Sequence, residues 1–165
     1  MKPADKPVLC VVSSHPIKGA SGVPTGFFLA ELTHPLKVLE DAGLKTTIAS
    51  IRGGQPPVDG FDLSDPVNAW FWNETDFQQR LATTPALSEL NGSDYSAVFF
   101  AGGVHTTDVV PYLLETALRE HGALHHEAPN WSENVVTDGR LITGQNPASA
   151  HGVGVALLNA LRQPT

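Results

Sequence analysis

The apolar run from Pro7 to Val12 constrains the fold of this chain more than any other segment. An uninterrupted, β-branched run of this length is typical of a strand buried on both faces, and such strands belong to parallel sheets. The run ends at the pair Ser13-Ser14. Thr46 to Ile51 and Tyr95 to Ala101 indicate two further strands of the same sheet. We therefore predict a sheet with helices on both faces.

A helix should follow the first strand. We expect it to run from about Gly26 to Ala42, because Thr25 can cap it and Gly43 can stop it. Pro35 lies inside this segment and should kink or split the helix, since proline lacks the amide hydrogen of a helical turn.

The rest of the chain continues the alternation. A short helix is expected from Asn73 or Thr75 to Leu81, a longer one over Val110 to Glu120, and a last one opened by Pro147 after Asn146. The last strands are predicted at Leu124 to Glu127 and at Asn134 to Thr143, the latter broken by the turn Asp138-Gly139. The fold class is thus α/β, a doubly wound, mostly parallel sheet like a truncated flavodoxin-like or amidotransferase-like sandwich.

Composition narrows the function classes. The chain has 165 residues, of which 41% are hydrophobic and 16% charged, so we expect one domain spanning residues 1–165. Its net charge of -7 argues against nucleic-acid binding. The single cysteine excludes an intrachain disulfide. With no apolar run of membrane-spanning length and no signal-like stretch, we expect a soluble, cytoplasmic protein without membrane contact.

Three segments of the chain resemble the ThiJ/PfpI superfamily, whose fold is like that of the class I glutamine amidotransferases. They are Thr25 to Pro35, Asp94 to Gly103, and the stretch from Val110 to Glu115 through Leu141 to Ala150. The resemblance is to the branch that holds heat-shock chaperones and cofactor-free glyoxalases. It implies that no cofactor and no metal is needed.

One departure from the family pattern affects the expected chemistry. In the family, a strand ending in a nucleophilic cysteine lies between the double glycine and the helix that resembles Val110 to Glu120. Here only Val104 to Val109 separate the two, so the nucleophile segment is missing. Cys10 lies in the middle of the first strand and is expected to be a buried apolar residue instead.

The resemblance makes Glu31 the family's acidic catalytic residue. Its segment is apolar, and a carboxylate in such a segment loses contact with water, which raises its pKa and makes it a usable acid or base. The alternative is a glutamate on the wet face of the helix. By the same resemblance, Gly102 and Gly103 offer backbone amides to an oxyanion, although a purely structural turn explains them as well.

Histidines and tryptophans add weaker candidates. His105 follows the double glycine and could donate a proton or orient a carbonyl, unless it is a surface histidine. His125 and His126 would face opposite sides of a strand, so we expect no shared metal site there. Trp70 and Trp72 flank Phe71, and this cluster could roof the substrate pocket, cover the sheet or form a subunit interface.

Two functions of different kinds follow. The first is a cofactor-independent acid–base enzyme, of the lyase, hydratase or isomerase type, that acts on a small carbonyl compound through Glu31 without a cysteine nucleophile. The second is a non-catalytic ligand-binding or chaperone-like protein derived from the same family. In either case the missing segment should leave apolar sheet surface open, so we expect a homodimer.

Overall fold

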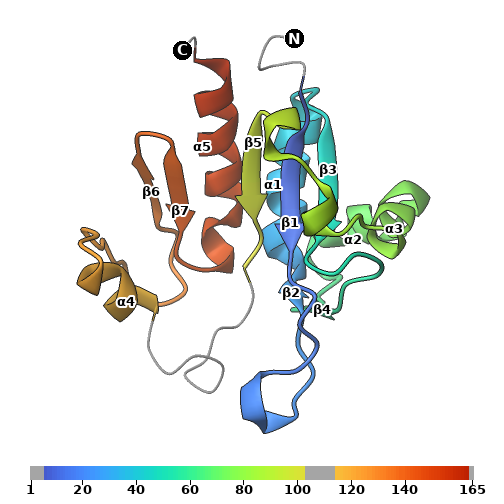
Figure 1. Ribbon diagram of the computed structural model, residues 1–165, viewed down its shortest axis with the longest axis horizontal. Helices are drawn as coiled ribbons and strands as arrows, with labels where there is room; N and C mark the ends of the chain where they lie inside the picture. The colour runs from blue at the N-terminus through green and yellow to red at the C-terminus, as the bar shows by residue number, and fades with distance from the viewer. Residues whose placement is uncertain (1–5, 103–113, 164–165) are drawn as a thin grey trace.

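Strand β1 (Val8–Val12) lies at the centre of a three-stranded parallel sheet. It pairs with β3 (Thr46–Ser50) on one side and with β5 (Ala97–Phe100) on the other side, which gives the order β3-β1-β5 (Figure 1). All five residues of β1 are buried, as its apolar sequence predicted. The structure is a computed structural model that describes residues 6–102 and 114–163.

Helix α1 (Leu29–Asp41) covers one face of this sheet. Its Leu32, Leu36 and Leu39 are fully buried in the same cluster as Val8 and Cys10. These leucines recur at the three- and four-residue spacing that places side chains on one face of a helix. The helix therefore shields the sheet face formed by alternate residues of β1.

The opposite face of the sheet is covered only in part. Leu9, Val11 and Ala49 are buried there beside Leu87 and Leu90. On the end strand β5, however, Val98 is 44% and Phe100 64% exposed, and their register partners are Leu9 and Val11. This face of β5 is therefore an apolar surface open to solvent.

The start of α1 differs from the sequence expectation. The segment before Leu29 is not helical: Phe27–Phe28 forms a short strand β2 that pairs in parallel with β4 (Val58–Asp59). Thr25 caps nothing, because its hydroxyl donates to Asp59 instead, at 2.8 Å. Gly26 allows this pairing, since a Cβ there would lie 2.1 Å from the carbonyl oxygen of Pro57.

Pro35 does not split α1, which is continuous from Leu29 to Asp41. Proline removes one hydrogen bond from the helical ladder, but α5 (Ala150–Arg162) packs against α1 at this point. A Cβ on Gly154 of α5 would come within 2.9 Å of the Pro35 Cα, so only a glycine permits the close approach. Packing of α5 therefore compensates for the missing bond.

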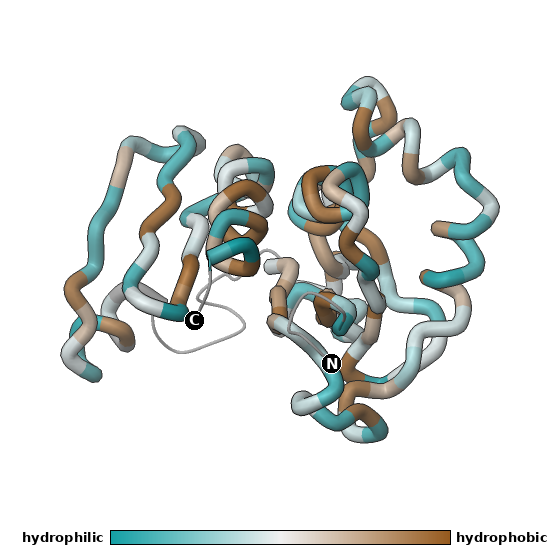
Figure 2. Tube along the Cα trace, turned by 90° about the horizontal axis from the view of Figure 1, so that it is seen from above, coloured by the Kyte–Doolittle hydropathy of each residue, from teal (hydrophilic) through white to brown (hydrophobic). Residues whose placement is uncertain are grey.

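The remaining elements lie at the two ends of the molecule. The hairpin of β6 (Val135–Asp138) and β7 (Leu141–Gly144) is at one end, and α2 (Pro66–Asn73) with α3 (Thr75–Ala82) is at the other (Figure 2). Helix α4 (Leu114–Glu120) lies below the hairpin in Figure 1. The described part of the chain contains no helix long and apolar enough to cross a membrane.

Two further expectations need correction, and a third is confirmed. The turn Asp138-Gly139 joins β6 and β7 in an antiparallel pair, so the stretch from Asn134 is a hairpin outside the parallel sheet. Leu124 to Glu127 forms no strand. The last helix begins as expected, because the Asn146 side chain accepts a hydrogen bond from the Ala148 amide at 3.0 Å before α5 starts.

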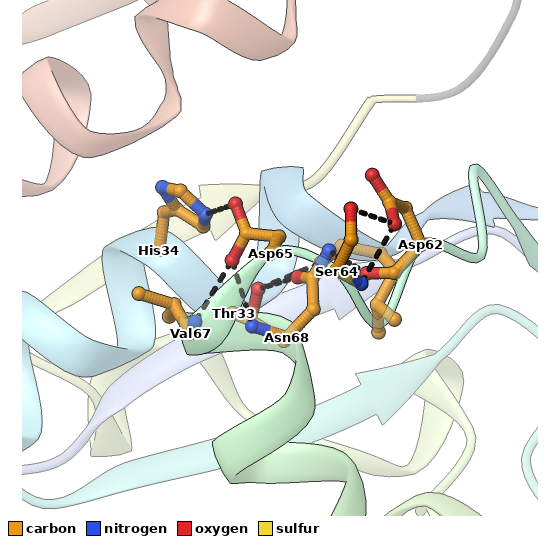
Figure 3. Close-up of polar contacts among 8 residues, drawn as sticks. Thr33, His34, Asp62, Ser64, Asp65, Val67 and Asn68 are labelled. Carbon is orange, nitrogen blue, oxygen red and sulfur yellow. Dashed lines mark hydrogen bonds and ion pairs between the residues drawn. The ribbon is translucent and has the colours of Figure 1, made fainter.

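A polar network fixes α2 on α1 (Figure 3). The Thr33 hydroxyl donates to the Asn68 side chain at 2.5 Å, and both residues are buried. The Asn68 amide group then donates to the carbonyl oxygen of Asp62 at 2.9 Å. Asp65 caps α2 by accepting from the amides of Val67 and Asn68. Because its members are satisfied, this network holds the residues before α2 in one arrangement.

Substituting Asn68 by alanine should destabilise the fold. The change removes the hydrogen bonds of the Asn68 side chain with the buried Thr33 hydroxyl and with the carbonyl oxygen of Asp62. Each lost hydrogen bond typically costs about 0.5–1.5 kcal/mol. Urea unfolding followed by circular dichroism measures the loss. Asn73→Ala, at an exposed position of the same helix, serves as the control and should cost much less. Equal losses would contradict the role given to the network.

Candidate active site

The candidate site lies where β5 ends and α1 begins. Both segments come to the carboxyl edge of the parallel sheet, which is where α/β proteins bind ligands. The amide of Phe28 donates to the carbonyl oxygen of Gly102 at 3.2 Å and so ties the end of β5 to the start of α1. This contact sets the position of the first helical turn, which carries Glu31.

Glu31 and Gly102 touch in the structure. A Cβ on Gly102 would lie 2.5 Å from Glu31 Oε2, so any other residue would collide with the carboxylate. The backbone N–H of Gly102 donates a hydrogen bond to that carboxylate. Gly102 is thus a glycine because the carboxylate occupies the space of a side chain.

Burial raises the pKa of the Glu31 carboxyl above its ordinary value, and the hydrogen bond from Gly102 opposes this shift in part. Desolvation dominates because the charged form loses contact with water. Such a carboxyl exchanges protons closer to neutral pH than an ordinary glutamate, which suits a general acid or base. The interpretation of Glu31 as a fully solvated surface residue is wrong.

The other predicted site residues stand apart or cannot be placed. Gly103 and His105 lie outside the described residues. Trp70 is 47% exposed, with the ammonium of Lys37 at 5.2 Å from its ring centroid.

Trp72 packs edge-on against Phe61, with 4.7 Å between the ring centroids. These contacts attach α2 to its neighbours, so the roles of Trp70 and Trp72 in substrate binding stay predictions.

Cys10 cannot serve as the nucleophile in its present surroundings. It is fully buried at the centre of β1, and burial raises the pKa of its thiol to about 12. Cysteine reacts as the thiolate, which is scarce near neutral pH at such a pKa. The expectation that Cys10 is a buried apolar residue is confirmed.

The sequence analysis overlooked the residues beside β1 and β3 at the same edge. A pocket of about 170 Å³ is lined there by Ser13, Ser14, His15, Ile51 and Arg52. Their signal in the sequence was positional: each directly follows a strand predicted for the parallel sheet, as Gly102 follows β5. No family motif marked them.

His34 belongs to the polar network and not to the site at Gly102. Its Nε2 lies 2.9 Å from Asp65 Oδ2 (Figure 3). Burial alone would raise the pKa of Asp65, but hydrogen bonds from Asn68 and Val67 and the nearby imidazole together lower it below its usual range. His34 therefore holds α1 against the cap of α2.

A parallel sheet of this order, with helices packed on it, matches the flavodoxin-like and class I glutamine amidotransferase-like fold. The structure superposes with a TM-score of 0.89 on Rapid Encystment Protein 24 KDa of Francisella tularensis, at 27% identity over 96% of this chain and 100% of that one. Glyoxalase III of Candida albicans gives 0.81 at 18% identity, over 95% and 98%. The structure therefore has the fold that the resemblance to the ThiJ/PfpI superfamily implied.

Sequence comparison finds a similar protein for only a part of the chain. The chain is 43% identical over 51 residues to the glutathione-independent glyoxalase HSP31 of Saccharomyces cerevisiae. That stretch is 30% of this chain and only 21% of the yeast protein. No family model matches the chain.

Replacing Gly102 by alanine tests the geometry of the site. The added methyl group should push the Glu31 carboxylate toward water, because it would lie 2.5 Å from Oε2. Since desolvation is the larger cause of the raised pKa, the pKa of Glu31 should fall toward that of an ordinary glutamate. A 13C NMR titration of the side-chain carboxyl measures the change.

Gly92→Ala is the matched control, because a Cβ there meets nothing within 4 Å. It should leave the pKa of Glu31 where it is in the parent protein. A Glu31 pKa that is the same in all three proteins would show that Gly102 does not shape the carboxylate's surroundings.

Proposed function

We propose that this protein is a cofactor-independent acid–base enzyme, of the lyase, hydratase or isomerase type, that acts on a small carbonyl compound. The observation that carries the proposal is the desolvated Glu31 carboxyl held against Gly102 at the carboxyl edge of the sheet. The names of two similar proteins, both glyoxalases, support a carbonyl compound as substrate. The lone, buried Cys10 suits a reducing compartment, and we propose the cytoplasm.

The proposed reaction begins with proton abstraction. The ionised Glu31 takes a proton from the carbon beside the substrate carbonyl, and the C–H electron pair forms the double bond of an enolate. The carbonyl electrons move to oxygen, which needs a hydrogen-bond donor. Glu31 then returns the proton to a carbon of the enolate or to a leaving group. No nucleophile of the protein is consumed in these steps.

In this proposal the backbone N–H of Gly102 supplies that donor. Its single N–H donates to the Glu31 carboxylate in the structure, and in the proposed reaction it turns to the substrate oxygen as negative charge develops there. The predicted oxyanion role of Gly102 and Gly103 and the proton-donor role of His105 belong to this proposal. Gly103 and His105 lie outside the described residues, so the proposal does not depend on their positions.

Hydrogen–deuterium exchange into a substrate tests proton abstraction directly. The protein is incubated in D2O with hydroxyacetone, pyruvate or dihydroxyacetone phosphate, and NMR measures deuterium at the carbon beside the carbonyl. Glu31→Gln keeps the shape and the acceptor for Gly102 but removes the base, so exchange should fall at least a hundredfold. Glu89→Gln removes an equal charge at an exposed position and should keep the full rate.

The pH dependence has a definite sign. A base must be ionised, so the exchange rate should rise with pH through a pKa above that of an ordinary glutamate. Over the same interval the folded state holds the proton more tightly than the unfolded state does, so stability falls as pH rises. Glu31→Gln should lose both dependences. Exchange that is equally fast in Glu31→Gln, or absent from the parent protein with every probe, would contradict the proposal.

A second candidate function is a non-catalytic, chaperone-like or ligand-binding homodimer. The exposed face of β5, formed by Val98 and Phe100, favours it, because contiguous apolar sheet surface is usually covered by a partner. We propose that a second copy of the chain covers this face in either function.

Light scattering at micromolar concentration tests the dimer. The parent protein should have twice the mass of the chain, and Phe100→Ser should shift it toward the monomer. Val23→Ser replaces a residue of similar exposure, 51%, in the loop before β2, and should remain dimeric. A parent protein that is monomeric at these concentrations would rule out this role for β5.

A further inference from the structure

The pocket beside β1 and β3 lies on the same edge of the sheet as Glu31. It is lined by Ser13, Ser14, His15, Ile51 and Arg52 and has a volume of about 170 Å³. Ser13 directly follows β1, which is the neighbour of both β3 and β5. The ends of β3 and β5 are therefore two interstrand spacings, about 10 Å, apart. The pocket and the segment that contacts Glu31 therefore follow neighbouring strands at the same end of the sheet.

The backbone amide and the guanidinium of Arg52 are both hydrogen-bonded to Ser14. Its backbone amide donates to the Ser14 hydroxyl oxygen at 3.0 Å, and its guanidinium Nη2 donates to the Ser14 carbonyl oxygen. Just beyond it, Gly54 donates to the carbonyl oxygen of Thr84 at 2.8 Å, and the buried Thr84 hydroxyl donates to Ser50. The main chain that carries Arg52 is thus attached on both sides.

Arg52 also has no acidic partner within ion-pair distance among the residues that the structure describes. This is notable in a chain of net charge -7, where Lys37 and Arg80 both pair with carboxylates. A guanidinium has five N–H donors in a planar fork, and the contact with Ser14 uses only a part of them. The rest can bind an anion with two parallel hydrogen bonds.

The neighbours of Arg52 fit the same ligand. The Ser13 hydroxyl oxygen accepts from the His15 amide at 3.1 Å, which leaves the hydroxyl hydrogen available to a ligand oxygen. The His15 side chain lines the pocket and adds a positive charge when protonated. The larger hollow of about 420 Å³ at the other edge of the sheet differs, because its Arg80 already pairs with Glu40 and Asp76.

We propose that this pocket is an anion subsite in which Arg52, assisted by Ser13 and His15, binds a carboxylate or phosphate group of a small molecule. The proposal that the pocket binds an anion depends on the pocket alone. If the proposed function holds as well, the substrate is an anionic carbonyl compound whose charged group binds Arg52 and whose carbonyl group lies beside Glu31; this part rests on the proposed function.

NMR titration of the full chain tests the subsite. Inorganic phosphate and glyoxylate are added separately to the 15N-labelled protein, and the two arms distinguish a phosphate from a carboxylate ligand. At least one probe should shift the amides of residues 13–15 and 52 in a saturable manner, and added NaCl should weaken its binding. Arg52→Gln should bind that probe at least tenfold more weakly.

Two further variants separate charge from structure. Arg140→Gln removes one positive charge at an exposed turn between β6 and β7 and should bind within twofold of the parent protein. Arg52→Lys keeps the charge but loses the planar fork, so its affinity should lie between those of the parent and Arg52→Gln. Equal affinity of the parent and Arg52→Gln, or shifts that centre on Arg80, would overturn the proposal.

The subsite and the proposed function can be contradicted by separate experimental results. Glu31→Gln should bind the anion at least as tightly as the parent protein while its proton exchange is lost. Anion binding without exchange in any probe would contradict the acid–base enzyme but leave the subsite in place. Exchange together with unchanged anion binding in Arg52→Gln would contradict the subsite alone.

Discussion

Strand β1 has hydrogen-bonded neighbours on both edges and packed side chains on both faces, and the rest of the molecule is attached to it. Its pairing with β3 and β5 brings segments together that are far apart in the sequence. The buried side chains of one face, such as Cys10, contact the leucines of α1, and those of the other contact Leu87 and Leu90. Burial of such side chains supplies most of the folding free energy, so this core holds the carboxyl ends of the strands in place.

The parallel direction of the strands explains why the candidate chemistry gathers at one edge. Parallel strands end on the same side, so Arg52, Ser13 and Gly102 follow three neighbouring strands there. The start of α1 is tied to Gly102 through Phe28, which adds Glu31 to the same edge. The pair Glu40 and Arg80 lies at the other edge beside Thr46 and binds α3 to the sheet.

The sequence predicted those parts of the fold that depend on strong local patterns. β1 is a continuous apolar run and is fully buried, as that pattern predicts. β3 and β5 were also predicted as strands, but Val98 and Phe100 of β5 are exposed. The two-residue pairing of β2 with β4 was missed, because it depends on the approach of Pro57 to Gly26 rather than on any repeating pattern. The cap of α2 had a readable signal, Asp65 followed by Pro66, which the aperiodic surroundings concealed.

For the site, resemblance and local pattern contributed differently. Glu31 and Gly102 came from a family motif, and the structure brings the two into contact. Arg52 carries no motif, and its proposed role depends on the lack of a carboxylate within ion-pair distance among residues 6–102 and 114–163, which only three-dimensional placement can reveal. Leu124 to Glu127 forms no strand, because it contains a single apolar residue, the 89% exposed Leu124, and so has no apolar face to bury against the sheet.

The position of β5 at the end of the described sheet has a consequence for how such chains vary in length. In the sheet, β1 pairs with β3 and with β5. Elements added or lost beyond β5 therefore leave the register between β1 and β3 unchanged. Glu31 depends on α1 and on the last residues of β5, and it therefore keeps its place as well. Elements beyond β5 can therefore differ between proteins of this fold while the strand order β3-β1-β5 and the position of Glu31 stay the same.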